Sequence, residues 1–351
     1  MKIYQITHSA DLDGMASAAL MRHYYKVPLN RIFFTNYDGK IFKGAVSVIK
    51  SLKGRGDLLL ISDFGMNAKN VKPMKDALQG FKGRGNYVIW LDHHPWTEHE
   101  TNEIAKVCDI LVNGEMASCG TELVYKFLCR RDAFGDRIVA ITHLADFVDT
   151  CFFVHRDCFV KQIKRITKKV KSKSDVQSAR EERIIRRLGS VIKELGRGDS
   201  PSSPGLRKVV DLLSSGQLEA PLIKKIEKRY IEETAPYRRE LLGNAKVYGL
   251  NGIKVAIGFS KKINNQEACM TMQEKLKSEV AIYINYGSGH CSVRSDVTVD
   301  SSGISRALGG GGHPQASGFS IKPSQLTAER REKVTKKILA VAKKRLRRTP
   351  L

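Results

Sequence analysis

The stretch Tyr87-Val88-Ile89-Trp90-Leu91-Asp92-His93-His94-Pro95 is the most informative part of this sequence. Its first five residues are apolar and predict a short buried strand. One acidic residue and two imidazoles follow that strand directly. Carboxylates and neutral imidazoles are ligands for Mn²⁺ and related divalent metals. Asp-His-His alone is weak evidence for a metal site, so its meaning depends on the rest of the chain.

Two earlier predicted strands are followed by side chains of the same kind. Residues 2–7 lead into an acidic motif that begins at His8, and residues 58–62 lead into Asp63. One strand often ends in polar residues, because Asp favours turns, but three such strands indicate a shared site. In open parallel sheets, ligands bind beside the carboxyl ends of the strands. We therefore expect a two-metal site of the type that hydrolyses phosphate esters. Its candidate ligands are His8, Asp11, Asp13, Asp63 and His93.

Together these motifs resemble those of the DHH phosphoesterases. Three segments look like the first three motifs of that family: His8-Ser9-Ala10-Asp11-Leu12-Asp13-Gly14, Asp63-Phe64-Gly65 and Asp92-His93-His94. The fourth motif is an Asp after a mostly apolar stretch, and residues 141–146 fit it. Far downstream, residues 309–319 resemble the Gly-rich motif of the DHH-associated substrate-binding domain. Order and spacing agree over most of the chain, and the basic middle section is covered least.

The resemblance implies a metal-binding role for each matching residue. One divalent ion would be held by His8, Asp11 and a bridging Asp63, and the other by Asp13, Asp63, His93 and Asp146. Mn²⁺ is the expected metal, with Mg²⁺ as the alternative, because carboxylates with imidazoles suit Mn²⁺ better than a thiolate-type zinc site does. Asp149 competes with Asp146 for the position of the fourth motif.

Neighbouring residues receive catalytic and supporting roles. His94 lies next to a ligand and is assigned to the scissile phosphate or the leaving oxygen, while Asp92 is expected to orient an imidazole. Ser118 or Thr121 is expected to cap the helix that follows, with substrate contact as the alternative. The mechanism implied is hydrolysis by metal-activated water, without a covalent enzyme intermediate.

The downstream motif predicts a phosphate-binding site. Four successive glycines allow backbone conformations closed to other residues, so their amides can approach an anion closely. Arginine adds a planar fork that fits phosphate oxygens. The expected substrate-binding residues are Arg294, Ser295, Gly311, Gly312 and His313.

The pattern of apolar residues predicts an α/β protein with two domains. Strands and helices alternate over the first 150 residues, which indicates βαβ units and a parallel sheet. We expect a DHH catalytic domain at 1–195 with flanking helices, and a helical linker at 196–243. A smaller mixed-sheet α/β domain follows at 244–351, with a basic C-terminal helix.

Several expectations concern single elements. A helix at 45–52 is expected, and another at 137–144 would place Asp146 after its end. Residues 206–242 read as helical pieces interrupted by Pro221 and Pro236. The dipeptide Asn251-Gly252 is a strong hairpin signal.

Charge and composition indicate a polyanionic partner. The 351-residue chain has 60 Lys and Arg against 36 Asp and Glu, a formal net charge of +24. Such a surface attracts polyanions, although some proteomes carry excess basic residues generally. An oligonucleotide or a single-stranded nucleic acid is the expected partner. The basic segment 160–195 is either a solvated helix or a wall of the substrate groove.

The remaining features bear on location. No apolar run approaches the roughly 18 residues of a membrane span, so no membrane partner is expected. The seven Cys show no CxxC spacing, which argues against a disulfide framework or a zinc site. A cytoplasmic protein is expected, and a homodimer is left open.

These inferences together predict a metal-dependent phosphodiesterase. The first expectation is a nanoRNase-like hydrolase that cuts short oligonucleotides to mononucleotides, with adenosine bisphosphate hydrolysis as a side activity. A RecJ-like exonuclease on single-stranded DNA or RNA is the second, favoured by the charge. A cyclic or linear dinucleotide phosphodiesterase is the third, and an inactive nucleic-acid-binding partner is the fourth. Pyrophosphate or polyphosphate hydrolysis is less expected, because the second domain resembles the nucleotide-processing branch.

Overall fold

The structure is a computed structural model that describes residues 1–150 and 202–348, apart from residues 10, 36–38, 67, 95, 114–118, 219, 297 and 313. The predictions for His313 and for the basic segment 160–195 therefore lie outside the described residues. The side chains of residues 39–41 and 143–150 also lie outside the description. Among the described helices, none is long and apolar enough to cross a membrane.

The chain forms two compact units, which are described separately. The first unit includes the residues up to Asp146 and, after the undescribed segment, those up to Glu227. Lys228 begins the main part of the second unit, which continues through the remaining chain. The chain thus changes from one unit to the other after Asp146 and again after Glu227, and the predicted domain bounds stay a prediction.

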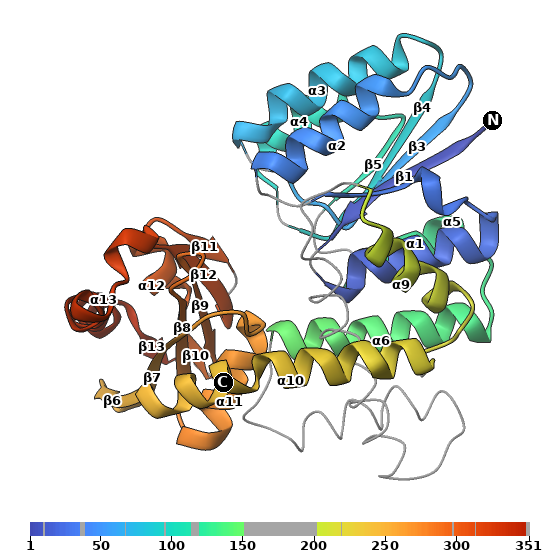
Figure 1. Cartoon of the computed structure of the whole chain (residues 1–351). Helices are drawn as coiled ribbons and strands as arrows, with labels where there is room; N and C mark the ends of the chain where they lie inside the picture. Colours follow the sequence, from blue (N-terminus) through green and yellow to red (C-terminus); the bar gives the residue numbers. More distant parts are fainter. Residues whose placement is uncertain are drawn as a thin grey trace. The chain divides into compact units, whose positions relative to one another are not determined.

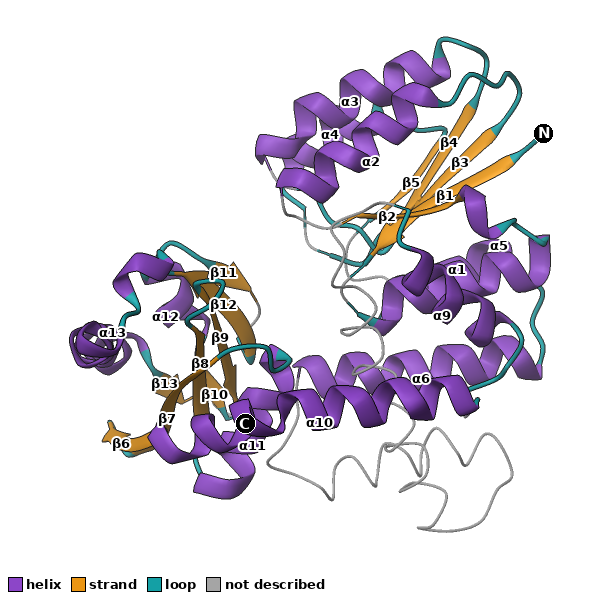
Figure 2. Cartoon of the chain, viewed as in Figure 1, coloured by secondary structure: helices purple, strands orange, loops and turns teal. Residues whose placement is uncertain are grey.

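The first unit contains a five-stranded sheet, which can be followed in Figures 1 and 2. Its strands are β1 (Ile3–His8), β2 (Ile32–Thr35), β3 (Leu58–Ser62), β4 (Tyr87–Leu91) and β5 (Ile110–Val112). Their order is β2-β1-β3-β4-β5, and every neighbouring pair is parallel. The predicted parallel sheet is confirmed. Because β1, β3 and β4 lie side by side, the three motifs that follow them emerge at the same edge.

Helices cover both faces of this sheet (Figure 2). One face carries α2 (Gly39–Ser51), α3 (Ala68–Lys82) and α4 (Glu98–Ala105). The other carries α1 (Leu12–Tyr25), α5 (Gly120–Leu128) and α9 (Pro204–Ser214). A short 3₁₀ turn, Leu29–Arg31, precedes β2. The core between the sheet and α2–α4 is centred on Trp90, Phe64 and Phe81, which are fully buried.

Two helices, α2 and α6 (Ala133–Thr150), extend beyond their predicted ends. Helix α2 begins at Gly39, because Phe42, Val46 and Ile49 continue one apolar face at spacings of four and three residues. Helix α6 continues through Asp146. The expectation that Asp146 follows the end of a helix is therefore wrong, since the apolar pattern of this helix runs past it.

The second unit contains a six-stranded mixed sheet. Its strands are β6 (Lys246–Leu250), β7 (Ile253–Ser260), β8 (Val280–Asn285), β9 (His290–Ser295), β11 (Gly311–Gly312) and β12 (Ala316–Ser320). The order is β11-β12-β9-β8-β7-β6, with β7 and β8 parallel and the other pairs antiparallel. Asn251 and Gly252 both have positive φ, of 53° and 74°, as a two-residue hairpin requires.

Helices cover this second sheet as well. Part of α10 (Pro221–Asn244) and α11 (Asn265–Leu276) pack on one cluster of core residues, and α12 (Ser302–Ala307) and α13 (Arg331–Arg345) pack on another. Two 3₁₀ turns, Pro323–Gln325 and Ala328–Arg330, precede α13. The short strands β10 (Val299–Asp300) and β13 (Arg347–Arg348) pair with each other. The predicted basic C-terminal helix corresponds to α13, which spans Arg331–Arg345.

Helix α10 corrects one expectation. Pro236 was expected to interrupt it, but the helix is continuous from Pro221 to Asn244. Proline removes one backbone hydrogen bond from a helix interior. Contacts on both sides of the proline offset that loss: the Tyr230 hydroxyl and the Arg238 Nε donate to Glu267 of α11, at 2.8 and 2.5 Å. Tertiary packing therefore overrides the local signal.

Candidate metal centre

The first motif forms a compact turn between β1 and α1. Asp11 caps α1: its Oδ1 accepts from the Gly14 amide at 3.2 Å, and its Oδ2 lies 2.9 Å from His8 Nδ1. Burial would raise the pKa of Asp11, but His8 and the Gly14 amide hold it well below its usual range. A Cβ on Gly14 would lie 2.1 Å from the His8 carbonyl oxygen, so only glycine fits there.

Asp63 occupies the centre of the site in a strained backbone conformation. Its φ is 51°, a left-handed value that few residues other than glycine adopt. The Asp63 amide donates to the Leu91 carbonyl at 3.0 Å, which extends the β3–β4 pairing by one residue. Gly120 packs against it, because a Cβ at that position would lie 2.7 Å from the Asp63 Cβ. The backbone thus fixes where the Asp63 carboxylate points.

The surroundings of the Asp63 carboxyl group suit a bound cation. The residue is 1% exposed, and its Oδ2 has no hydrogen-bond partner among the described residues. Burial and the nearby carboxylates of Asp13, Asp11 and Asp92 raise the pKa of Asp63 well above its ordinary value. A buried carboxylate without a donor is unfavourable unless a positive charge compensates it. These groups therefore fit a divalent metal ion.

Asp13 is held by the start of helix α5. Its carboxylate accepts from the Gly120 amide and the Thr121 amide, each at 2.7 Å, and from the Thr121 hydroxyl at 2.6 Å. The same hydroxyl lies 3.2 Å from Ser17 Oγ. Sequence reasoning missed this role for Thr121 and expected either a helix cap or a substrate contact. The available signal was a Gly-Thr pair at the start of a helix, where free amides attract carboxylates.

The two histidines of the third motif have different surroundings. His93 Nε2 lies 3.5 Å from Asp63 Oδ1 and 3.6 Å from Asp13 Oδ2. Burial lowers the pKa of His93, although Asp13 acts in the opposite direction. The uncharged imidazole is the form that binds metals. His93 thus has both the position and the uncharged form that a metal ligand requires.

Asp92 orients His94. Asp92 is fully buried, and its carboxylate accepts from His94 Nδ1 at 2.8 Å, from the His94 amide at 3.2 Å and from Trp96 Nε1 at 2.8 Å. Burial opposes the charged imidazole, but Asp92 outweighs it and raises the pKa of His94 to about 9. The contact with Trp96 was not expected from the sequence.

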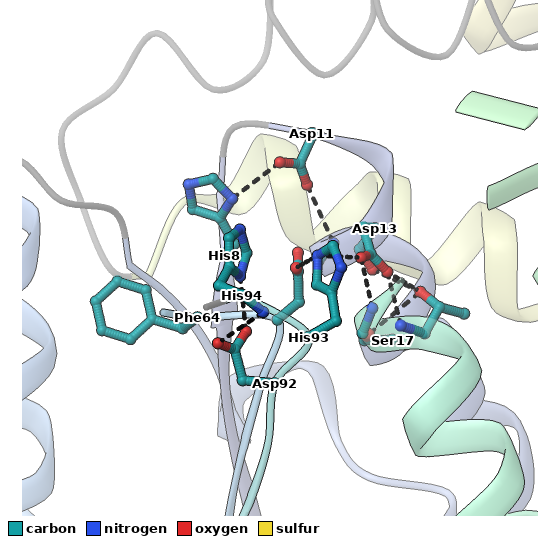
Figure 3. A network of polar contacts seen from close by, with 12 residues as sticks. His8, Asp11, Asp13, Ser17, Phe64, Asp92, His93 and His94 are labelled. Carbon is teal, nitrogen blue, oxygen red and sulfur yellow. Dashed lines mark hydrogen bonds and ion pairs between the residues drawn. The ribbon is translucent and has the colours of Figure 1, made fainter. Parts of the chain in front are cut away.

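Figure 3 shows His8, Asp11, Asp13, Asp92, His93 and His94 gathered in one network of polar contacts. Two groups of ligand atoms, each within 4.8 Å of one another, could hold metal ions: one is His8, Asp11 and Asp63, and the other is Asp63, His93 and His94. Asp63 belongs to both groups, as a bridging ligand would. The second group contains His94, where the sequence suggested Asp13. The side chains of Asp146 and Asp149 lie outside the described part of the chain.

The predicted phosphate-binding residues belong to the second unit. Arg294 Nε is buried without a hydrogen-bond partner in the described structure, while Nη1 donates to the Val293 carbonyl at 3.1 Å. The Ser295 hydroxyl is buried and donates to the Val299 carbonyl at 2.7 Å, so it shapes the adjoining loop. Gly311 and Gly312 form β11 and are exposed, and the φ of Gly312, 125°, requires glycine. Substrate contact by these residues stays a prediction.

Two family models match the chain. The DHH family, N-terminal domain, matches residues 2–150, and the DHHA1 domain matches residues 252–344. No curated protein matches the sequence.

Solved structures with the same fold include two from bacteria. A pGpG-specific phosphodiesterase from Vibrio cholerae is 14% identical with a TM-score of 0.52, covering 96% of this chain and 99% of its own. An exopolyphosphatase-related protein from Bacteroides fragilis is 16% identical with a TM-score of 0.52, covering 98% of this chain and 93% of its own. At these identities the likeness concerns the fold.

Proposed function

Because the chain belongs to the DHH family of phosphoesterases, we propose that it is a metal-dependent phosphodiesterase that hydrolyses short oligonucleotides to mononucleotides, as a nanoRNase does. The observation that carries this proposal is the Asp63 carboxylate. It is buried, lacks a hydrogen-bond donor on Oδ2 and belongs to two groups of metal-ligand atoms. That arrangement suits a pair of divalent ions, and paired ions suit phosphodiester hydrolysis.

The proposed metal ligands come from four segments. One ion would be held by His8, Asp11 and Asp63. The other, as the family resemblance implies, would be held by Asp63, His93, Asp13 and Asp146, and His93 Nε2 lies 3.6 Å from Asp13 Oδ2. Two such ions, with Mn²⁺ proposed and Mg²⁺ as the alternative, would lower the pKa of the attacking water and offset charge on the phosphate.

The chain's own residues position the reactants. Asp92 fixes the His94 ring through Nδ1, so that the imidazole is oriented to contact the scissile phosphate or the leaving oxygen. Thr121 and Gly120 hold the carboxylate of Asp13. In the second unit, Arg294 and the exposed backbone of Gly311 and Gly312 would bind the phosphate of a nucleotide.

A RecJ-like exonuclease on longer strands is the second candidate. The net charge of +24 favours it, because a strongly basic surface attracts long polyanions more than short ones. A dinucleotide phosphodiesterase is the third candidate, because the Vibrio cholerae protein with the same fold is a pGpG-specific phosphodiesterase. An inactive nucleic-acid-binding protein is the remaining alternative.

The test is Mn²⁺-dependent hydrolysis of end-labelled RNA, single-stranded DNA and pGpG. Lengths would run from two to about thirty nucleotides at two salt concentrations, since phosphate contacts make binding salt-dependent. Preference for the shortest RNA supports the proposal. Degradation of long strands that is lost at high salt would favour the RecJ-like exonuclease instead. Activity confined to pGpG would favour the dinucleotide phosphodiesterase. If the protein binds strands tightly but shows no metal-dependent hydrolysis, the inactive nucleic-acid-binding protein is favoured.

A further inference from the structure

The second unit contains a pocket that none of the roles assigned above explains. It has a volume of about 470 Å³ and is lined by Asp300, Gly303, Arg306, Ala307, Arg345 and Arg347. These residues come from β10, α12, the last turn of α13 and β13, whose places are visible in Figure 1. The volume is in the range of small-ligand sites.

The walls of the pocket are fixed by packing. Asp300 and Arg347 are directly paired in the β10–β13 ladder. A Cβ on Gly303 would lie 3.5 Å from the Arg345 Cβ, so α12 approaches the end of α13 closely. Ile304 of α12 and both Ala342 and Leu346 around the end of α13 are buried in the same core cluster. The pocket is therefore built from ordered elements of one unit.

The charges in the pocket are unbalanced. Three arginines line it together with one aspartate. The Asp300 carboxylate already accepts from the Ser302 amide and hydroxyl, at 2.9 and 2.6 Å. Within the described structure, Arg345 and Arg347 make no side-chain hydrogen bond or ion pair, and Arg306 donates to the Ser302 hydroxyl. The adjacent Arg348, by contrast, is paired with Glu279 at 2.9 Å.

This chemistry selects for phosphate. Guanidinium groups bind phosphate oxygens in a fork geometry, and three of them favour a ligand with at least two negative charges. None of the lining residues is aromatic, so the pocket offers no aromatic ring on which a base would stack. The ligand is therefore recognised by its phosphates and not by its bases.

We propose that this pocket binds two neighbouring phosphates of an oligonucleotide, as a second anion site on the same unit as the Gly-rich segment. Helix α12 connects the two sites: Ser305 accepts from the Gly310 amide at 2.8 Å, and its hydroxyl lies 2.7 Å from Ser317 Oγ of β12. A strand held in the pocket is thus retained beside the segment expected to bind its end. That the ligand is an oligonucleotide rests on the proposed function, whereas the presence of an anion-binding site does not.

The test compares two charge-matched pairs of substitutions in the full chain. Arg345→Gln with Arg347→Gln removes two charges from the pocket. Lys343→Gln with Lys344→Gln removes two charges from exposed positions of α13 that do not line the pocket. Binding of a labelled, 5′-phosphorylated heptanucleotide is measured by fluorescence anisotropy in EDTA. We expect the pocket pair to lose about tenfold or more in affinity, as for lost charge-assisted hydrogen bonds, and the lysine pair to lose about twofold or less.

Equal losses in both pairs would overturn the proposal, because they would mean diffuse attraction to a basic surface. No loss in the pocket pair would also overturn it. Thermal midpoints check that each variant folds, and single Arg345→Gln and Arg306→Gln variants replace the pair if it does not. Competition by pyrophosphate that depends on Arg345 would show that two adjacent phosphates suffice, whereas competition by strands alone would show that the nucleic-acid backbone is needed.

The same variants separate this proposal from the proposed hydrolysis. Binding is measured without divalent metal, so an inactive metal centre does not affect it. If wild-type protein hydrolyses nothing but the pocket pair still loses affinity, the anion site stands and the activity fails. If hydrolysis of an unphosphorylated dinucleotide is normal while strand affinity does not depend on the pocket, the activity stands and the anion site fails.

Discussion

At the residue scale, Asp63 combines three features that seldom occur together. It has a left-handed φ, it is almost fully buried, and one of its carboxylate oxygens has no partner within the described structure. Strain and unsatisfied polar atoms persist only where the surrounding structure imposes them. Gly120 and the Leu91 carbonyl impose them here. The backbone thus holds a carboxyl group where a cation would be bound.

Replacing Asp63 with Asn tests that interpretation. The substitution keeps the shape but removes the charge, so we expect hydrolysis to fall by about a thousandfold or more, as when a central metal ligand is lost. The free energy of unfolding in EDTA should stay the same or increase, because asparagine removes a buried carboxyl group whose ionised form is destabilised by burial and by its neighbouring carboxylates. Activity assays and urea denaturation measure both. Unchanged hydrolysis would show that the metal centre has been assigned to the wrong residues.

Gly120 should be intolerant of any side chain. A Cβ there would lie 2.7 Å from the Asp63 Cβ and 2.9 Å from its Cα, so Gly120→Ala should destabilise the protein by about 1–3 kcal/mol. It should also weaken metal binding, because Asp63 must move. Gly80→Ala is the matched control: Gly80 lies in α3 with nothing within 4 Å, and alanine should stabilise it by about 0.5–1 kcal/mol. Similar denaturation midpoints for the two variants would contradict the close contact.

Sequence reasoning worked at this scale for residues that follow strands. His8, Asp11, Asp63 and His93 were expected to meet, and they do, because parallel strands deliver their carboxyl ends to one edge. The contacts of Thr121 with Asp13 and of Trp96 with Asp92 could not be predicted. They depend on how loops and helices dock on the sheet, which no local pattern in the sequence encodes.

At the element scale, helix α5 acts as a support for the metal centre. Its first residues direct two amides and one hydroxyl at the Asp13 carboxylate. The partial positive charge at a helix N-terminus favours an ionised carboxylate. Asp13 is therefore held in place by a different element from the one that carries it, which restricts its motion before any metal binds.

The support predicts a graded response to substitution of Thr121. Thr121→Val removes the hydroxyl and keeps both amides, so metal affinity should fall about 10- to 100-fold, the usual effect of losing an outer hydrogen bond to a ligand. Thr121→Ser should restore most of it. Thr142→Val is the control, since the buried Thr142 hydroxyl donates only to the Ile138 carbonyl of its own helix. Titration with Mn²⁺ would measure the affinities, and equal affinity of Thr121→Val and wild type would exclude the supporting role.

Element boundaries show where sequence patterns stop being sufficient. The hairpin at Asn251-Gly252 was predictable, because turn chemistry acts locally. Helix α10 was not, because the contacts of Tyr230 and Arg238 with α11 compensate the proline between them. Helix α6 likewise continues past its expected end.

At the scale of the whole molecule, two chemistries belong to two units. The groups that could hold metal belong to the first, while Arg294, the Gly-rich segment and the arginine pocket belong to the second. Composition predicted a polyanionic partner from the net charge of +24. It could not predict the pocket, because residues 300–307 and 345–347 are brought together only by the fold.

This separation predicts that metal and substrate stabilise different parts of the protein. A ligand that binds only the folded state stabilises it by about 2.7 kcal/mol at a hundred times its dissociation constant. Adding Mn²⁺ in place of EDTA should therefore raise the unfolding temperature of the first unit. Calorimetry measures this temperature. Asp63→Asn should abolish the shift, because the residue shared by both ligand groups has lost its charge. Arg294→Ala should keep the full metal shift and lose affinity for the nucleotide, since Arg294 lies in the other unit. A metal shift that disappears in Arg294→Ala would mean that the two chemistries are not separable.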